Sequence, residues 1–281
     1  MGSGSQTFST RRRNRWTMKI LVTVKEVTDL AADFQIADAE IDETYLEYEL
    51  NEWDAYAIET GVQLVEAGIA DEVIVATIGP ERAEESVRMA LAKGADRAIR
   101  VWDDALAEQD LLDVATKAEI FASVVEAEEP EVVLTGVQAN DDGFGATGVA
   151  LAERLDYGWA AVVNALELDA DEGGAHVRRE LEGGLEELSD VTLPAVFTIQ
   201  TGINQPRYAS LRGIREAEAK EIERKTLSDL GITKADAASA LQITDLFEPV
   251  AEREVAYFDG DPDEQVEQVA DVLADSGVVG E

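Results

Sequence analysis

From residue 18 onward, short apolar runs alternate with longer segments in which apolar residues recur at helical spacing. The apolar runs occupy residues 20–24, 72–77, 97–101, 132–136 and 195–199, and the helical segments occupy residues 52–66, 80–93, 108–126 and 145–154. Strands that are separated by helices in this way form a mostly parallel sheet. The chain is therefore predicted to be an α/β protein with a Rossmann-like, mostly parallel sheet.

Two segments depart from this alternation. Residues 161–168 and 176–181 read as strands on either side of a polar turn, which predicts an inserted β-hairpin. After residue 225 the chain becomes polar, and an amphipathic pattern over 262–275 then predicts a helix with an apolar stripe. We expect an α/β domain at 18–227 and, at 228–281, a C-terminal arm and helix that pack on the domain or on a partner.

The composition excludes several kinds of chemistry. The chain has no cysteine and a single histidine, His176. Thiol nucleophiles, disulfides, iron–sulfur ligation and a histidine-based metal site are therefore excluded, and we expect His176 to lie at the surface. No carboxylate pair stands out from the acidic background as an acid–base pair. No apolar run approaches the ~20 residues that span a bilayer, so we expect no direct membrane insertion.

The charge is strongly negative, with 60 acidic against 23 basic residues and a formal net charge of −37. The acidic residues are spread along the chain, which favours adaptation to a high-salt, halophilic cytoplasm over an acidic patch for one basic partner. A face this acidic excludes nucleic-acid binding. Residues 1–17 differ, with four arginines and no acid. We expect them to be disordered, or to reflect a mis-assigned start or residues foreign to the native protein.

Residues 193–214 combine an apolar strand with a turn rich in Gly, Asn and Pro, followed by Arg207, Tyr208 and Leu211. A charged helix is predicted to begin near Arg215. A loop with a cation, an aromatic side chain and an isolated apolar residue is typical of a recognition surface. The alternative is that Leu211 packs into the core of its own domain.

Residues 132–155 form a second informative segment. A buried strand ends at Gly136 and is followed by Gln138, Asp141 and Asp142, then by a glycine-rich turn with Gly145, Ala146 and Thr147 before a helix. Glycines and a helix N-terminus suit an anion such as phosphate. The segment is neither a Walker loop nor a GxGxxG motif. It predicts a nucleotide site, with an ordinary strand–loop–helix connection as the alternative.

Other strand ends are expected at the same edge of the sheet, because the carboxyl ends of parallel strands meet there. These ends carry Thr23, then Asn51 with Trp53 and Asp54 at the start of a helix, and Ile78. Asn51 is predicted to cap that helix. Together with the glycine-rich turn, these loops predict a nucleotide cleft.

Six ordered blocks resemble the beta subunit of electron-transfer flavoprotein over residues 18–227. They are ILVTVKEVTD, LNEWDAYAIETGVQL, VIVATIGPERAEESVRMALAKGADRAIRV, VVLTGVQANDDGFGATGVALAERL, RRELEGGLEEL and LPAVFTIQTGINQPRYASLRGI. The resemblance implies a fold like that of the adenine-nucleotide alpha-hydrolases. It also implies a heterodimer with an alpha subunit that carries most of the FAD site, and an AMP, or in bifurcating members a second FAD, in this subunit.

Matched by position, the nucleotide would contact Thr23, the segment from Asn51 to Asp54, Ile78, and the segment from Gly136 to Thr147. The resemblance puts Trp53 close to the flavin of the alpha subunit, with core packing as the alternative. Two positions depart from the family. Gly145 and Ala146 stand where AMP-type members have an Asn-Gln pair, and Glu52 stands where proline is common. Both departures leave it open whether this subunit binds AMP or FAD.

The resemblance implies an electron carrier and not an acid–base catalyst. It would accept electrons from acyl-CoA or other dehydrogenases, through the loop with Arg207, Tyr208 and Leu211, and pass them to a quinone oxidoreductase. Two alternatives remain. One is an electron-bifurcating subunit with its own FAD and NADH oxidation, and the other is a stand-alone nucleotide-binding module without redox chemistry.

Overall fold

The computed structural model describes residues 18–37, 40–169, 173–248 and 257–277. The chain divides into two compact units, Met1–Asp245 and Leu246–Glu281. The predicted extension at residues 1–17 lies outside the described residues. The first unit runs past residue 227, the domain end expected from the sequence, because Ile232 and Ala237 are buried in its core.

The first unit is built on a mostly parallel sheet. Among the described residues the sheet has nine strands in the order β11-β10-β9-β12-β8-β1-β6-β7-β13. Its parallel strands are β1 (Lys19–Thr23), β6 (Glu72–Ile78), β7 (Arg97–Val101), β8 (Val132–Gly136), β9 (Gly158–Asp169), β12 (Ala195–Ile199) and β13 (Ile222–Lys225). The predicted α/β, Rossmann-like class is confirmed. Strand β13 was not predicted, because its sequence, IERK, is mostly charged.

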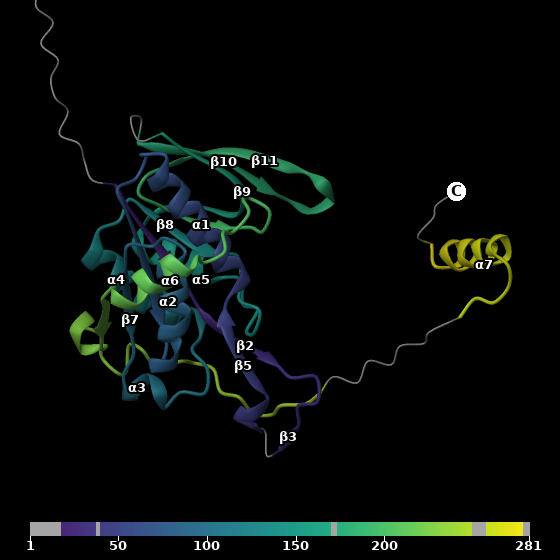
Figure 1. The fold of residues 1–281 in the computed structure, drawn as a ribbon, viewed down its shortest axis with the longest axis horizontal. Helices are drawn as coiled ribbons and strands as arrows, with labels where there is room; N and C mark the ends of the chain where they lie inside the picture. Colours follow the sequence, from purple (N-terminus) through teal and green to yellow (C-terminus); the bar gives the residue numbers. More distant parts are fainter. Residues whose placement is uncertain (1–17, 38–39, 170–172, 249–256, 278–281) are drawn as a thin grey trace, which may run out of the picture. The chain divides into compact units, whose positions relative to one another are not determined.

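The predicted hairpin is confirmed by β9 and β10 (Gly174–Glu180), which pair in antiparallel register. A third strand, β11 (Glu186–Thr192), extends the hairpin at the end of the sheet (Figure 1). The sequence of β11, EELSDVT, is largely exposed and lacks apolar alternation, so the pattern did not separate it from a loop.

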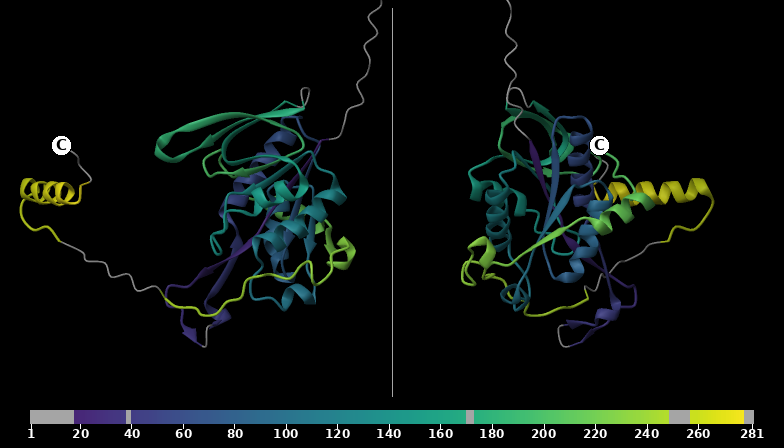
Figure 2. Two further views of the ribbon diagram at one scale, coloured as in Figure 1. Left: turned by 180° about the vertical axis from the view of Figure 1, so that it is seen from behind. Right: turned by 60° about the vertical axis from the view of Figure 1, so that its left-hand side comes forward.

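Helices cover both faces of the sheet (Figure 2). One face packs against α1 (Glu52–Glu66), α2 (Glu84–Ala92) and α6 (Leu211–Ala219). The other packs against α3 (Asp104–Ala107), α4 (Val114–Glu128) and α5 (Thr147–Leu155). Side chains alternate between the two faces along each strand. Leu21, for example, faces the α4 side together with its register partners Ile74 and Val133.

Several helix boundaries differ from the predicted ones. The helix expected at 108–126 begins at Val114, because the Asp113 side chain accepts a hydrogen bond from the Thr116 N–H at 2.7 Å. The helix expected near Arg215 begins at Leu211, because Ser210 caps it. Helix α2 is preceded by a 3₁₀ turn, Glu81–Ala83. Side-chain caps of this kind fix a helix start more sharply than apolar spacing does.

A small antiparallel ribbon precedes α1 and was not predicted. Strands β2 (Glu26–Leu30) and β5 (Leu46–Leu50) pair with each other, and the short strands β3 (Ile36–Ala37) and β4 (Glu40–Ile41) lie between them in the sequence. A 3₁₀ turn, Glu43–Tyr45, leads into β5. The ribbon is rich in acids and mostly exposed, so it lacks the apolar runs from which strands are predicted.

The first unit ends with a 3₁₀ turn, Ser228–Leu230, and an irregular segment. The second unit contains the predicted terminal helix, α7 (Pro262–Asp275). Asp261 and Glu264 form a capping box, and Pro262 occupies the first turn. The expected apolar stripe of α7 consists of Val266, Val269, Val272 and Leu273. Within the described residues, no helix is long and apolar enough to cross a membrane.

Candidate functional site

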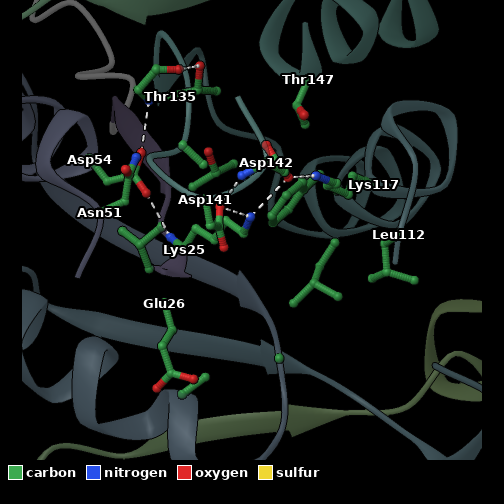
Figure 3. Close-up of a pocket in the computed structure, with 18 of the residues that line it drawn as sticks. Lys25, Glu26, Asn51, Asp54, Leu112, Lys117, Thr135, Asp141, Asp142 and Thr147 are labelled. Carbon is green, nitrogen blue, oxygen red and sulfur yellow. Dashed lines mark hydrogen bonds and ion pairs between the residues drawn. The ribbon is translucent and has the colours of Figure 1, made fainter. Parts of the chain in front are cut away.

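A cavity of about 300 Å³ opens at the carboxyl ends of β1, β6 and β8, where the sequence predicts a nucleotide cleft (Figure 3). Most of the predicted nucleotide residues line this one cavity: Thr23, Asn51, Asp54, Ile78, Gly136, Gln138, Asp141, Asp142, Gly145, Ala146 and Thr147. They come together because parallel strands deliver their following loops to one edge of the sheet. Trp53 is the predicted residue that does not line it.

Asn51 and Asp54 join the loops of the cavity from the start of α1. Asn51 is buried, and its side-chain Nδ2 donates a hydrogen bond to the Gln138 carbonyl at 2.9 Å. Its Oδ1 accepts a hydrogen bond from the Asn140 N–H at 3.3 Å. Asn51 does precede α1, but its side chain holds the 138–140 loop instead of capping the helix. Asn51 therefore occupies the predicted N-cap position, but its side chain makes no capping hydrogen bond.

The Asp54 carboxylate connects the ends of two strands. Its Oδ2 accepts a hydrogen bond from the Lys25 N–H at 2.7 Å, and its Oδ1 accepts one from the Gly136 N–H at 3.1 Å. The side chain is only 5% exposed. Burial raises the pKa of Asp54 to about 7, against the lowering effect of these hydrogen bonds and of Asn51. Asp54 therefore holds β1 and β8 in a fixed relation below the cavity.

Two lysines and two aspartates form an ion-pair cluster at the cavity (Figure 3). The Lys25 ammonium lies 2.5 Å from Asp141 and 2.9 Å from Asp142, and the Lys117 ammonium lies 2.5 Å from Asp142. Burial tends to raise the pKa of Asp142, but hydrogen bonds from Lys117 and Lys25 hold it below its ordinary value. The cluster brings two cations to the cavity of a chain whose net charge is −37.

Helix α5 points its N-terminus at the cavity, since Ala146, Thr147 and Gly148 all line it. Among the described residues, no side chain caps this helix start, and its first turn carries no acid. Exposed N–H groups at a helix start favour an anion. Gly148 is required by packing, because a Cβ there would lie 2.6 Å from Thr135 Oγ1 and 2.7 Å from Thr198 Cγ2.

One wall of the cavity was missed by sequence reasoning. It comes from the segment after β7 and from α4, and it is formed by Trp102, Leu106, Gln109, Leu112, Lys117 and Phe121. Lys25 was also not counted among the site residues, although it follows β1 directly. Scarcity was an available signal, because the chain has only seven lysines and two of them, Lys25 and Lys117, meet here.

Trp53 lies away from the cavity lining, on the first turn of α1. Its Nε1 donates a hydrogen bond to Gln200 Oε1 at 3.2 Å, which joins α1 to the end of β12. The indole is half-buried. The flavin contact implied by the family resemblance stays a prediction.

The loop expected to recognise partners presents two of its three residues to solvent. Tyr208 is 97% exposed and Leu211 is 79% exposed, so Leu211 is not folded into the core of the described unit. Arg207 instead turns its guanidinium toward Glu59 and Glu66 of α1.

His176 lies at the surface as expected, 2.5 Å from Asp190. The hydrogen bond to Asp190 and the charge of that carboxylate raise the pKa of His176. Within the described residues, no group of three His, Cys, Asp or Glu side chains is placed to hold a metal ion.

The comparisons with known proteins agree on one family. The model of the electron transfer flavoprotein domain matches residues 38–230. The electron transfer flavoprotein subunit beta of Methylophilus methylotrophus is 44% identical over 226 residues, which are 79% of this chain and 84% of that protein.

Two further relatives carry the same description. The mitochondrial subunit beta of Arabidopsis thaliana is 38% identical over 83% of this chain and 90% of its own length. That of Bacillus subtilis is 32% identical over 91% and 97%. The cavity lies at the sheet edge predicted from the blocks that carry the resemblance, and the chain belongs to the electron transfer flavoprotein family, as a beta subunit.

Proposed function

We propose that this subunit binds an adenine nucleotide, AMP in the first instance, in the cavity at the ends of β1, β6 and β8. Membership of the family implies flavin-linked electron transfer and an alpha subunit as partner. The bound nucleotide would be structural, and FAD held mainly by the alpha subunit would supply the redox chemistry. The heterodimer would accept electrons from acyl-CoA or other dehydrogenases and pass them to a quinone oxidoreductase.

The observation that carries this proposal is the donor set around the cavity. The N-terminus of α5 supplies backbone N–H groups and the Thr147 hydroxyl, and two lysines, which are ion-paired with Asp141 and Asp142, lie at the same cavity. These are the groups that bind phosphate. The volume of about 300 Å³ stands at the low end of the ~300–1,000 Å³ typical of ligand pockets, which favours a mononucleotide over a dinucleotide.

The remaining residues fit the nucleoside part of such a ligand. Ile78 and Phe121 offer apolar surface to a base, while Gln138 and Asp141 offer polar groups to a ribose. The departures from the family motif at Gly145 and Ala146 do not obstruct the turn. A Cβ at Gly145 would lie 3.8 Å from the Val137 carbonyl oxygen, an ordinary contact distance, so this position does not choose between AMP and a larger ligand.

Nucleotide content tests the proposal. The chain is co-expressed with its alpha subunit, the heterodimer is purified in molar salt and denatured, and the released FAD and AMP are quantified per heterodimer. One FAD and one AMP are the expected result. Two FAD without AMP would replace the proposal by an electron-bifurcating subunit. A chain that forms no complex and carries no flavin would instead be a stand-alone nucleotide-binding module.

A matched pair of variants locates the nucleotide. Thr147→Val removes a hydroxyl at the start of α5 and should lower the AMP content while the FAD content is kept. Thr201→Val makes the same change on a loop that does not line the cavity, and should leave both contents unchanged. Equal AMP content in all three proteins would contradict the assignment of AMP to this cavity.

The charge supports a further part of the proposal, a halophilic cytoplasm as the working environment. A net charge of −37 on 281 residues produces strong self-repulsion, which molar salt screens to within ~3 Å. Proposed partners meet this subunit through the loop that exposes Tyr208 and Leu211, since exposed aromatic and aliphatic residues on a polar surface are typical docking residues.

A further inference from the structure

A second charged cluster lies outside the cavity, on the loop between β12 and α6. The Arg207 guanidinium contacts Glu59 through Nε at 2.7 Å and Nη2 at 3.1 Å. It contacts Glu66 through Nη1 at 2.7 Å and Nη2 at 2.9 Å. Arg207 therefore makes two bidentate pairs with carboxylates two turns apart on α1, the strongest arrangement available to an arginine.

The Glu59 carboxylate is the buried member of this cluster, with its side chain 6% exposed. Glu59 also accepts hydrogen bonds from the Arg207 backbone N–H at 3.2 Å and from Gln63 Nε2 at 2.7 Å. Burial tends to raise the pKa of Glu59, but these hydrogen bonds hold it below its ordinary value. Arg207 thus joins the loop to α1 through a carboxylate that stays charged.

Further contacts hold the same loop on the two helices. Asn204 Nδ2 donates hydrogen bonds to the Tyr56 carbonyl at 3.0 Å and to Thr60 Oγ1 at 2.9 Å, both on α1. From the C-terminal end of α2, the Lys93 ammonium donates one to the Arg207 carbonyl at 2.6 Å. The loop is therefore bound to α1 and α2 on both sides of the arginine.

The start of α6 is fixed in the same way. Ser210 Oγ accepts a hydrogen bond from the Gly213 N–H at 3.0 Å. A Cβ at Gly213 would lie 2.5 Å from the Ala92 carbonyl oxygen, so α6 approaches α2 as closely as a glycine permits. Tyr208 and Leu211 stand between these fixed points and are exposed. Their backbone is thus held by the contacts of Arg207 before them and of Ser210 and Gly213 around the helix start.

We propose that Arg207 is a positioning residue for electron-donor docking: it contacts α1 and not the donor, and it holds Tyr208 and Leu211 in the conformation that the donor meets. The inference rests on the proposed function, in which those two side chains dock onto a dehydrogenase. A loop ordered before binding loses less conformational entropy on association. Without the guanidinium, the two glutamates repel each other, and the loop keeps on α1 only the Asn204 contacts and the Arg207 backbone N–H, so it is held less firmly.

The test uses the full chain in its heterodimer, in molar salt, with an acyl-CoA dehydrogenase as the electron donor. Reduction of the flavin is followed while the dehydrogenase is titrated, which gives KM for the dehydrogenase and kcat. R207M should raise KM roughly tenfold, since single docking residues are worth about that much, and should leave kcat unchanged. R207K should give a KM between those of the parent and R207M, because one ammonium cannot pair with both carboxylates in a bidentate manner.

A second measurement separates positioning from general destabilisation. Backbone hydrogen exchange over residues 201–210 should be faster in R207M, while exchange in β8 and the nucleotide content stay as in the parent. Arg154→Met is the matched control, because Arg154 also makes a bidentate pair, with Glu119 at 2.6 and 3.0 Å, and lies on α5. Arg154→Met should change neither KM nor the exchange of the loop. R207M/E59Q removes the buried charge along with its partner and is measured if R207M fails to fold.

The outcomes are distinct. If L211A raises KM but neither R207M nor R207M/E59Q does, the positioning role of Arg207 is wrong and the docking surface stands. If L211A leaves KM unchanged, the proposed docking surface itself fails, whatever Arg207 does. Raised KM and faster loop exchange in the Arg207 variants, with kcat and nucleotide content constant, would support the proposal.

Discussion

Helix α1 buries two carboxylates, Asp54 and Glu59, and surrounds them differently. Asp54 lies at the cavity and accepts hydrogen bonds from the backbone N–H groups of Lys25 and Gly136. Glu59 lies beneath residues 201–210, the docking loop, and is paired with the Arg207 guanidinium. The pKa of Asp54 is raised to about 7, whereas that of Glu59 is lowered. Two acids on one helix thus shift in opposite directions.

The difference shows what compensates for burial. Asp54 is the more deeply buried of the two and loses more solvation, of which backbone dipoles offset only part, whereas at Glu59 a guanidinium in direct contact offsets more than all of a smaller loss. The cavity is consequently held by a group that gains a proton easily, and the loop by one that keeps its charge. Four changes of solution or sequence test this contrast, starting with the one that should affect both regions most.

Removal of salt should have the largest effect. Dialysis from molar salt to about 0.1 M lengthens the screening distance from ~3 to ~10 Å, and a chain of net charge −37 should then unfold. Circular dichroism and elution volume follow the transition. R207M should move its midpoint to higher salt by removing a cation. Unchanged dichroism of the parent at about 0.1 M would contradict the prediction.

Acidification should change the stability contributed by the two carboxylates in opposite directions. The folded pKa of Asp54, about 7, exceeds the ordinary value of 3.8, so the folded state binds the extra proton between these values. Stability contributed by Asp54 is therefore present below about pH 4 and declines by up to about 4 kcal/mol as the pH rises toward 7. Urea unfolding of the parent and of D54N measures this. The difference between the two proteins should change across this range, and parallel curves would show that Asp54 titrates normally.

Glu59 should behave in the opposite sense. Its folded pKa lies below the ordinary value of 4.5, so its contribution is full above that pH and is lost as the pH falls further. In the same titration, the free energies of unfolding of E59Q and the parent should therefore differ mainly at and above pH 4.5. Over that range the difference between D54N and the parent is still changing. The pair of variants distinguishes a buried acid with a cation from one without.

Loss of Arg207 should convert the second carboxylate into one like the first. R207M leaves Glu59 buried beside Glu66 without its paired cation, with only Lys93 as a more distant positive charge, which should cost about 3 kcal/mol in the free energy of unfolding. The pKa of Glu59 should then rise, because burial is no longer opposed. Urea unfolding checks the cost, and R207M/E59Q should recover most of it. A loss no larger than that of the exposed control R154M would show that the cluster contributes little.

The sequence was sufficient to predict the cavity but not the loop contacts. Thr23, Ile78 and Gly136 each end or follow a predicted strand, and parallel strands must deliver such residues to one edge, while Asn51 was expected there from the predicted start of a helix. The pairing of Arg207 with Glu59 joins residues 148 positions apart on two different elements. No local period marks such a pair, so it required the structure.

Other parts escaped prediction for related reasons. Lys117 and Phe121 reach the cavity from α4, which crosses from β7 to β8, three positions away in the sheet, so strand ends do not identify them. In the ribbon β2–β5, β5 reads LEYEL and alternates apolar and acidic residues, but it is short and none of its residues is buried, and β2 buries only Val27. Apolar patterning finds elements that build the core, whereas charged elements and side-chain contacts between distant segments leave no pattern of that kind.

The smallest expected effects come from two glycines that permit close packing, one in each region. Gly148→Ala would place a Cβ 2.6 Å from Thr135 Oγ1 at the cavity, and Gly213→Ala would place one 2.5 Å from the Ala92 carbonyl at the docking loop. Each should cost about 1–3 kcal/mol in urea unfolding, since overpacking forces neighbours apart. Gly148→Ala should also lower the AMP content, because it displaces the N-terminus of α5, while Gly213→Ala should raise KM for the donor instead. If either variant disturbed the other region's measurement, the cavity and the loop would be one coupled site, and the contrast between Asp54 and Glu59 would not mark two independent regions.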